Sequence, residues 1–477
     1  MPAILVAYTT ALTAGTALFG WNLAELNAPQ NAIQEDLGLG AAQFGLASSI
    51  LAIGGLLGSA AATPSMNAFG RKKILIGTAI AFGVAGSLKA IAGSATLLTL
   101  GRFIGGIASG SAAVIVPIYI NELAPPASKG ALPNFFSGAL TQISINLGIL
   151  SSQVLGILLV TLENKGQWRF ILLTGGIIGF LQAASLLFLP ESPTSLVAAG
   201  KIGEARRMLV VIRGTSDVDE ELASYQSEPR EQQPEGTAET ENIAGQDPLI
   251  VAEAGQSPGS PDTEPARETT PLLGGSRTTE AENSPIGLME FVRKREYRSG
   301  FVIVAGVMLA QQLTGINAVV FYGVSILNDL LPNTAKFLNA AISAVNLLVT
   351  FGASFWFDRV SHRTLLLGSI FSMGISAAIL SICIACDLAI PSAVSTLVFV
   401  TSFSMGLGPL PWMVASLRIA QKGIGAAQSI ALIANWMGTF LVGFVVPVIA
   451  DAAGMYIVFA VFAVLSFLCF AWGVYFL

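Results

Sequence analysis

Apolar stretches of about 20 residues recur along this chain of 477 residues, and they limit its possible folds more than any other feature. As helices, stretches of this length cross a hydrocarbon core about 30 Å thick. Six precede a polar segment and six follow it, so we predict an all-α membrane protein of two six-helix bundles. The twelve spans are predicted at 5–27, 43–63, 74–93, 96–119, 132–159, 169–189, 299–327, 335–356, 364–385, 389–414, 424–449 and 453–475.

The scarcity of charged residues supports a membrane location. Only 11% of the residues are charged, against about 25% in an ordinary globular chain. More than half of these charges lie in residues 200–298. The rest of the chain has too little charge for a solvated surface, so most of it must face lipid. The same composition excludes a nucleic-acid-binding protein.

The polar segment divides the chain into three predicted parts. Residues 1–199 and 299–477 are predicted to form the two bundles, and residues 200–298 a cytosolic linker. The centre of the linker is rich in Glu, Pro, Ser, Thr and Gly, which predicts disorder. Its flanks, 200–213 and 289–298, combine basic residues with helical apolar spacing, which predicts amphipathic helices at a membrane surface.

Basic residues in the short loops predict the orientation of the spans. The loop after the second span carries Arg71, Lys72 and Lys73, and the linker flanks carry many more basic residues. Because cytosolic loops are enriched in Lys and Arg, we expect both termini and the linker on the cytosolic side.

Cysteine and histidine are too few for the usual metal or redox centres. The chain has one histidine, His362, and three cysteines, Cys383, Cys386 and Cys469. Cys383 and Cys386 lie in an apolar run without a second pair, so we interpret them as apolar helix residues. We expect no cofactor, no metal and no enzymatic activity.

Polar and helix-breaking residues cluster inside four spans, at 19–22, 311–317, 406–412 and 434–436. Amides at such depth are costly unless they are paired, and together they suit a neutral solute rich in hydroxyl groups. The alternative is that they only join helices to one another. Two six-helix halves are typical of a transporter whose site lies between them. The six amides are Gln153, Gln311, Gln312, Asn317, Asn346 and Asn435.

Several motifs, in order along both halves, resemble the sugar porter family of the major facilitator superfamily. Residues 19–30 (FGWNLAELNAPQ) resemble the first span of facilitative glucose transporters, and their NLAELNAPQ variant resembles fungal vacuolar members. The resemblance implies a twelve-helix fold, alternating access and a monosaccharide-like solute. The other matching motifs lie at 101–132, 190–193, 311–327, 408–412 and 434–443.

The resemblance also implies which residues surround the solute and control its passage. Tyr322 matches a position in the outer gate, and Arg102 one that is mainly structural. The implied solute-contacting residues are Gln153, Gln311, Gln312, Asn317, Asn346, Trp412 and Asn435, with Phe403 and Trp436 as aromatic neighbours.

Opposed charges in the cytosolic loops form a second implied group. In the family such charges bridge helix ends when the cavity opens outward, and they act as a latch. For the basic loop residues, plain anchoring on the cytosolic side is an equal alternative. Ser404 and Leu417 replace glutamates that the family usually has, so we expect a weak latch in the second half. The latch residues are Arg71, Glu122, Lys129 and Glu191 in the first half, and Asp358, Arg359 and Arg363 in the second.

Asn22 and Glu25 bear on energy coupling in opposite directions. Proton-coupled relatives carry an aspartate at the position of Asn22, and an asparagine cannot titrate, which favours uniport. Glu25, one turn later, is a carboxylate inside a span, and such groups can relay protons. Its alternative is a lumen-exposed or asparagine-paired side chain at a helix end.

A short sorting pattern lies in the predicted linker. Glu268 precedes Leu272 and Leu273 in an acidic dileucine arrangement of the kind that sorting adaptors bind on cytosolic segments. It favours a vacuolar or lysosomal membrane over the plasma membrane.

The predicted function is facilitative transport of a hexose-like monosaccharide. The alternatives are a proton-coupled transporter of a sugar, polyol or other small polar solute, which would use Glu25, and a sugar sensor that does not transport.

Overall fold

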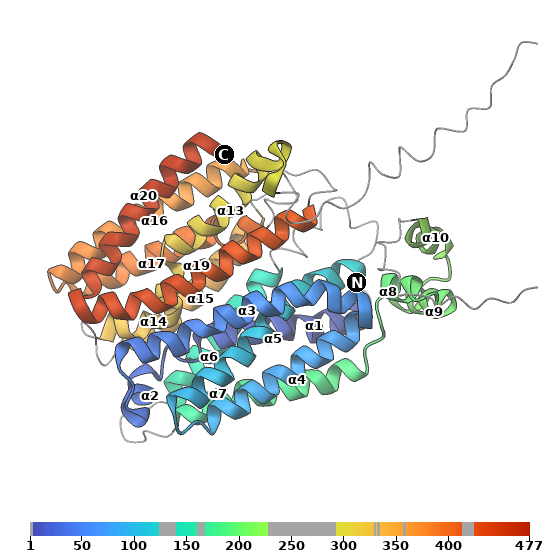
Figure 1. Ribbon diagram of the computed structural model, residues 1–477, viewed down its shortest axis with the longest axis horizontal. Coiled ribbons are helices and arrows are strands. Elements are labelled where there is room, and N and C mark those ends of the chain that lie inside the picture. Colours follow the sequence, from blue (N-terminus) through green and yellow to red (C-terminus); the bar gives the residue numbers. More distant parts are fainter. Residues whose placement is uncertain are drawn as a thin grey trace, which may run out of the picture. The chain divides into compact units, whose positions relative to one another are not determined.

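The computed structural model describes residues 3–123, 140–159, 167–227, 292–328, 331, 334–355, 359–412 and 424–477. Every regular element in these ranges is a helix (Figure 1). Helices suit the apolar runs because each backbone polar group is then satisfied within its own segment.

Among the described residues, the first part of the chain has seven helices up to residue 187 and three short ones after it. The helices are α1 (Ala3–Ala24), α2 (Gln30–Leu37), α3 (Ala41–Phe69), α4 (Arg71–Ala90), α5 (Ala95–Leu123), α6 (Leu140–Leu159), α7 (Trp168–Leu187), α8 (Pro193–Ala198), α9 (Ile202–Arg213) and α10 (Asp219–Ser227).

The second part begins at a short 3-10 turn. Its elements are η3 (Arg295–Tyr297), α13 (Arg298–Leu313), α14 (Ile316–Asn328), α15 (Ala335–Ser354), α16 (His362–Ala385), α17 (Ala389–Met405), α19 (Ile424–Ala453) and α20 (Met455–Phe476).

Helices lie at all twelve predicted spans. Among the described residues, ten helices are long and apolar enough to cross a membrane when Arg295–Asn328 is taken as one, and α17 is a shorter apolar helix. The predicted all-α membrane fold is therefore confirmed.

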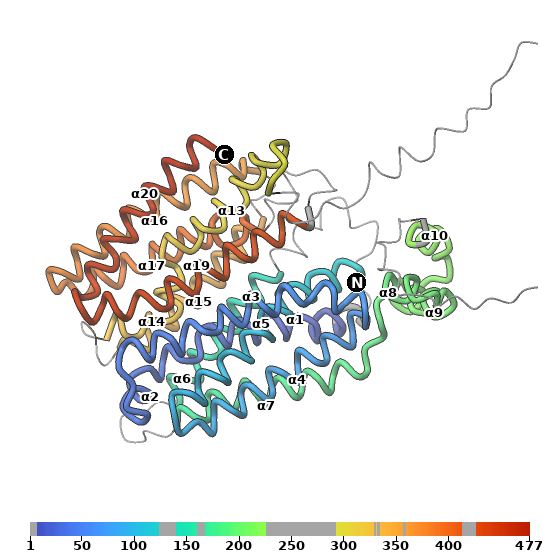
Figure 2. The backbone as a smooth tube through the Cα atoms, in the orientation of Figure 1, coloured from blue at the N-terminus to red at the C-terminus, as the bar shows by residue number. Residues whose placement is uncertain are grey.

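The long helices pack as two groups. In the first, α3 packs against α5, and α4 against α5 and α7; in the second, α16 packs against α17 and α20. Figures 1 and 2 show the blue-to-green helices of the first part lying together, as do the yellow-to-red helices of the second. The two groups meet where α19 packs on α3 and α15 on α6. We call these groups the first and second halves.

The helices are interrupted at two of the four polar clusters. Gly315, with φ at 94°, separates α13 from α14, and α17 ends at Met405, just before the cluster at 406–412. At 19–22 and 434–436, α1 and α19 continue through the clusters. Gly20 instead allows a close approach of helices, since a Cβ there would lie 1.9 Å from the backbone oxygen of Ile145.

The amphipathic helix predicted at 200–213 corresponds to α9. Its apolar residues Ala205, Met208, Leu209 and Ile212 are buried in one cluster with side chains of the long helices and of α8. The expectation that this face lies on lipid is therefore wrong, because protein already covers it. At 289–298, residues 292–293 are helical, and η3 and the start of α13 follow them. The residues before 292 lie outside the described ones, so the amphipathic helix there stays a prediction.

Contacts group Met1–Gln226 with Pro285–Leu477 in one compact unit, and Ser227–Ser284 in a second. The predicted sorting residues Glu268, Leu272 and Leu273 lie outside the described residues, as do Lys129 and Asp358. The predicted division at 199/200 and 298/299 stays a prediction.

Two names for the ends of the helical bundle are used below. The Lys89 end is the end at which α1 and α4 finish, and the Arg71 end is the end at which α4 begins.

Candidate functional site

A cavity lies between the two halves. It encloses about 590 Å³ of non-atom space, including the solvent at its mouth. The second half supplies most of its polar side chains, and α1 and α6 supply the facing wall. Its lining residues are Phe19, Leu23, Gln142, Ile145, Asn146, Ile149, Gln311, Gln312, Ile316, Asn317, Val320, Asn346, Phe403, Trp412, Asn435, Trp436 and Thr439.

Most of the predicted solute-contacting residues line this cavity. Gln153 does not: it is buried on α6, and its Oε1 has no hydrogen-bond partner among the described residues. The residues that the structure brings together are Gln311, Gln312, Asn317, Asn346, Phe403, Trp412, Asn435 and Trp436.

Gln311 is engaged by protein on both sides of its amide. Its Nε2 donates to the carbonyl oxygens of Leu407 (2.7 Å) and Gly408 (2.9 Å), which follow the end of α17. Its Oε1 accepts hydrogen bonds from Gln312 Nε2 (3.2 Å) and Asn435 Nδ2 (2.8 Å). Because an amide has two donors and two acceptor sites, Gln311 has no capacity left for a solute in this conformation. It holds the turn after α17 against α13.

The neighbouring amides keep free capacity. Asn317 Nδ2 donates to Gln312 Oε1 and to Thr439 Oγ1 (3.0 Å), while Asn317 Oδ1 bonds to none of the described residues. Asn435 likewise uses its Nδ2 and leaves its Oδ1 without a bond to the described residues. Gln312 uses one of its two N–H groups. Two acceptors and one donor therefore remain for hydroxyl groups in the cavity.

A polar network that includes Asn146, which the sequence analysis missed, crosses between the halves on the other side of the cavity. Asn146 on α6 donates from Nδ2 to Asn346 Oδ1 (3.2 Å) and Thr350 Oγ1 (3.0 Å) on α15. Ser404 Oγ also donates to Asn346 Oδ1 (2.7 Å). Asn346 Oδ1 is therefore occupied, whereas its Nδ2 bonds to none of the described residues. Gln142 Nε2 extends the network to Asn146 Oδ1 (3.1 Å).

Aromatic rings form the apolar walls. Trp436 packs against Phe19, with ring centroids 5.5 Å apart, and donates from Nε1 to Ser59 Oγ on α3 (2.9 Å). That hydrogen bond joins α19 to α3 and occupies the polar edge of the indole. The indole is only 1% exposed and also packs close to Gly55, so it forms part of the closed wall of the cavity.

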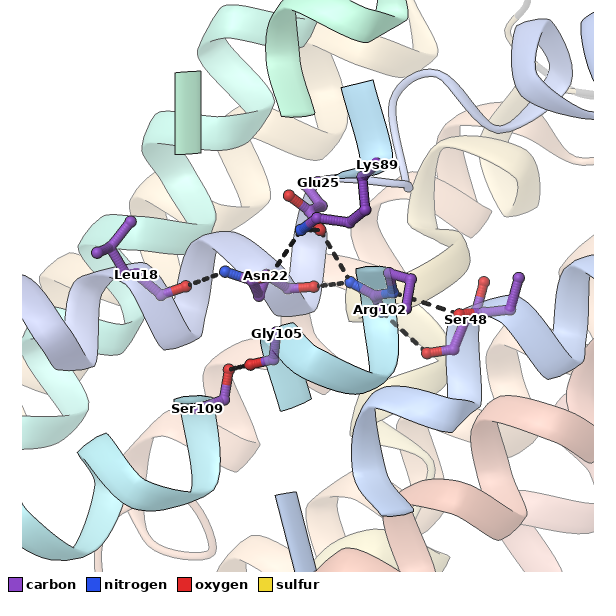
Figure 3. Close-up of polar contacts among 9 residues, drawn as sticks. Leu18, Asn22, Glu25, Ser48, Lys89, Arg102, Gly105 and Ser109 are labelled. Atoms are coloured by element: carbon purple, nitrogen blue, oxygen red, sulfur yellow. Dashed lines mark hydrogen bonds and ion pairs between the residues drawn. The ribbon is translucent and has the colours of Figure 1, made fainter. Parts of the chain in front are cut away.

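A cluster of buried ions lies apart from the cavity, within the first half (Figure 3). Glu25 Oε1 pairs with Lys89 Nζ and with Arg102 Nη1 (3.2 Å), and the side chains of all three are at most 1% exposed. Lys89 also donates to Asn22 Oδ1 (2.8 Å). Arg102 donates to the carbonyl oxygens of Asn22, Ala47 (3.3 Å) and Ser48 (2.9 Å).

The surrounding helices balance the charge of this cluster. One carboxylate faces two cations, which leaves one excess positive charge. The C-termini of α1 and α4 both lie here, with Lys89 in the last turn of α4, and each helix C-terminus carries about half a negative charge. The cluster is therefore close to neutral without any other ion. Gly101 and Gly105 of α5 make room for it, because a Cβ there would lie 2.6 Å from Lys89 Cγ and 2.7 Å from Asn22 Oδ1.

The expectations for Glu25 need correction. It is neither lumen-exposed nor paired with an asparagine, and it does not line the cavity. Its partner Lys89 lies 64 positions away, and no local spacing in the sequence links the two. Tyr322 is also buried; its hydroxyl donates to the carbonyl oxygen of Gly443, and its ring lies 6.3 Å from that of Phe44.

At the Arg71 end, two of the predicted latch residues of the first half, Arg71 and Glu122, contact each other. Arg71 pairs with Glu122 (3.1 Å), whose other oxygen accepts a hydrogen bond from Ser192 Oγ. Glu191 accepts a hydrogen bond from the backbone N–H of Lys72 (3.0 Å). In the second half, Arg363 donates to the carbonyl oxygen of Val474 (2.9 Å), and Arg359 forms no ion pair with the described residues. The roles of these residues as a latch stay predictions.

Comparison with known proteins identifies the family. The sequence matches the family described as "Sugar (and other) transporter" over residues 6–252 and 264–477. Two Saccharomyces cerevisiae proteins are each 30% identical to this chain. For "Probable metabolite transport protein YBR241C" the alignment covers 97% of this chain and 90% of the relative. For "Vacuolar protein sorting-associated protein 73" it covers 95% of this chain and 89% of the relative. The chicken facilitated glucose transporter member 3 is 28% identical, over 93% of this chain and 83% of the relative.

A solved structure shows the same fold. The Escherichia coli xylose transporter XylE, in an inward-open conformation, superposes on this chain with a TM-score of 0.75. The superposition covers 99% of this chain and 96% of the XylE chain, and the two sequences are 20% identical. With the family match across both halves, this confirms the resemblance found in the motifs and the fold that it implied. The chain belongs to the sugar transporter family of the major facilitator superfamily.

Proposed function

We propose that the chain is an alternating-access carrier that moves a hexose-like monosaccharide by facilitated diffusion. The single observation that carries this proposal is the set of unused amide groups in the cavity between the halves. Gln312, Asn317, Asn346 and Asn435 offer both donors and acceptors without charge. A sugar that leaves water needs such replacements for its lost hydrogen bonds.

The shape and lining of the cavity favour a ring-shaped solute. Trp412, Trp436, Phe19 and Phe403 give the cavity apolar faces next to the amides. A monosaccharide presents both kinds of surface, hydroxyl groups around its edge and C–H groups on its faces. The name of the chicken relative, a facilitated glucose transporter, supports the same class of solute.

The buried ion cluster favours uniport over proton coupling. Glu25 is paired with Lys89 and Arg102 and does not line the cavity. Its negative charge is needed because the two helix C-termini offset only part of the charge of these two cations. Protonation would leave Lys89 and Arg102 buried without their carboxylate, which is costly inside a bundle. We therefore propose that Glu25 is a structural partner of these cations rather than a proton carrier.

For the cellular location, we propose a vacuolar or lysosomal membrane, with both termini on the cytosolic side. The proposal is supported by the basic loop at Arg71–Lys73, by the dileucine pattern at Leu272–Leu273 and by the name of one yeast relative.

Uptake of labelled hexoses into proteoliposomes, with and without an imposed pH gradient, tests the proposal. A uniporter brings the solute to equal concentrations on both sides, and the gradient does not change that end point. A carrier that moves one proton with each sugar would accumulate it about tenfold for each pH unit. Protein-free liposomes are the control for leak. Accumulation that Glu25→Gln abolishes would establish proton coupling instead, and binding of sugar without uptake would favour the sensor.

A further inference from the structure

The amide of Asn346 faces the cavity with only one of its two ends. Its Oδ1 accepts a hydrogen bond from Asn146 Nδ2 (3.2 Å), and the hydroxyl oxygens of Thr350 (3.3 Å) and Ser404 (2.7 Å) lie within bonding distance of the same atom. Thr350 and Ser404 do not line the cavity, whereas Asn346 does. Asn346 Nδ2 bonds to none of the described residues and keeps some accessible surface. The oxygen therefore lies toward protein, and the N–H groups are left for the cavity.

Of these three partners, only Asn146 fixes the direction of the Asn346 amide. A hydroxyl can donate or accept, so Thr350 and Ser404 could pair with Asn346 whichever way its amide is turned. The Ser404 hydroxyl would then donate to the carbonyl oxygen of Val400, which lies 2.8 Å away. An amide N–H can only donate, so a turned Asn346 would bring its own Nδ2 against Asn146 Nδ2. The contact with Asn146 therefore excludes the turned amide.

Asn146 is itself held in one orientation. Its Nδ2 also donates to Thr350 Oγ1 (3.0 Å), and its Oδ1 accepts a hydrogen bond from Gln142 Nε2 (3.1 Å), one turn earlier on α6. The residue is buried between α6, which runs toward the Lys89 end with Gly156 against Ala28, and α15 of the second half. Side chains from both halves therefore set the direction of one amide in the cavity wall.

The amides on the other side of the cavity have the reverse polarity. Asn317 and Asn435 use their N–H groups on protein and leave Oδ1 without a bond to the described residues. Gln312 adds one free N–H to that side. Oxygen acceptors thus prevail on one wall, and Asn346 presents a donor on the other. A sugar hydroxyl can meet either wall, because it both donates and accepts.

We propose that Asn146 is a positioning residue that sets the polarity of one solute contact. By holding the Asn346 oxygen away from the cavity, it requires the solute to bring an acceptor to Asn346, either a hydroxyl or a ring oxygen. A group that can only donate, such as an ammonium, is disfavoured there because it would meet an N–H. This selection rule rests on the hexose transport proposed above, and it adds the direction of the hydrogen bond to the class of solute.

Competition of D-glucose analogues with labelled D-glucose, on the purified full-length protein in detergent, tests the proposal. At each hydroxyl-bearing carbon in turn, the hydroxyl is replaced by hydrogen in a deoxy analogue or by fluorine in a deoxyfluoro analogue. Fluorine accepts a hydrogen bond, though more weakly than oxygen, and cannot donate one, whereas hydrogen does neither. The ratio of the deoxy to the deoxyfluoro dissociation constant therefore reports, carbon by carbon, whether the protein donates to that position.

In the wild-type protein, this ratio should be about two to ten at the carbon that meets Asn346, the contribution of one neutral hydrogen bond. Gln312 can give a second such carbon. Asn146→Asp, measured at pH 8, places a carboxylate oxygen against Asn346 and should turn its amide, so that the ratio falls to about one at a single carbon. Asn146→Leu removes the donor without adding a charge, and it should lower the ratio at the same carbon even if the aspartate variant does not fold.

Thr350→Val is the matched control, because it also removes a hydrogen bond from Asn346 Oδ1 but leaves the Asn146 donor in place. It should keep the ratio at every carbon, even if it weakens the binding of all analogues alike. Unchanged ratios in both Asn146 variants would overturn the proposal, as would the same loss in Thr350→Val or wild-type ratios that are all near one. Failure of the proposed function would show differently, as a wild-type protein that does not bind D-glucose, and it would remove this contact as well.

Discussion

The cavity and the buried ion cluster both place polar groups deep inside the bundle, but they satisfy them differently. In the cluster, Lys89 and Arg102 balance Glu25, and backbone carbonyls take the remaining donors of Arg102. In the cavity, Asn317 and Asn435 each keep an oxygen without a bond to the described residues. Glu25 Oε2 bonds to none of the described residues, but it is buried among the cations and away from the cavity. The ion pairs stabilise a fixed arrangement, whereas unused capacity at the cavity is available to a solute. Burial of polar residues alone therefore does not locate a binding site.

The largest expected effect comes from breaking the ion cluster. Glu25→Gln should lower the free energy of unfolding by about 3–5 kcal/mol, because it leaves Lys89 and Arg102 buried without their carboxylate. Lys89→Met should cost less, because Glu25 keeps Arg102 as its partner. The double variant should lose less than the sum of the two single effects. Thermal unfolding in detergent, followed by tryptophan fluorescence, measures these changes. Lys73→Met is the control, since Lys73 is exposed on the same helix. Additive losses would mean that Glu25 and Lys89 do not act as a pair.

A smaller effect is expected in the cavity. Gln312→Ala should weaken solute binding about two- to tenfold, the loss of one hydrogen bond worth about 0.5–1.5 kcal/mol. Gln311→Ala should instead lower thermal stability more than affinity, because all four hydrogen bonds of Gln311 go to protein. Equilibrium binding of a labelled hexose separates the two effects. Gln153→Ala is the matched control outside the cavity, and a loss of affinity there equal to that of Gln312→Ala would contradict this assignment.

The smallest effect on the cavity and on the ion cluster is expected from a substitution in the linker. Leu272→Ala with Leu273→Ala should leave uptake and thermal stability unchanged but redirect the protein to another membrane. Fluorescence microscopy of tagged protein, beside a control with both neighbouring residues Pro271 and Gly274 replaced by alanine, measures this. A double leucine variant that still reaches the wild-type membrane would show that the pattern is not used for sorting.

The helices could be predicted from the sequence, because the length and apolar character of each span are local properties. The break at Gly315 was also predictable, since φ at 94° favours glycine. The polar clusters at 19–22 and 434–436 do not interrupt their helices, because small and polar residues there serve contacts between helices. Gly20 allows α1 to approach α6, and Asn435 bonds to Gln311 on α13.

The candidate site was predictable in part. Motif resemblance located the amides of the second half, whose roles stay predictions. It did not distinguish Gln311, which is occupied, from Gln312, which is not, because that difference depends on the turn after α17. Asn146, Lys89 and Asn27 were missed, since their partners lie 64 or more positions away and no sequence spacing indicates such contacts.

The hydrogen bonds between the halves have a consequence for how the protein responds to salt. Three side chains bond across the interface between the halves: Asn27 to the backbone of α14, Asn146 to α15, and Trp436 to Ser59. All of these hydrogen bonds join neutral groups. Dissolved ions weaken attractions between exposed charges, but they have little effect on buried bonds between neutral groups. The charges of the cluster remain within one half and are not separated when the halves part. As far as these contacts determine it, the balance between conformations should stay the same in dilute and in concentrated salt.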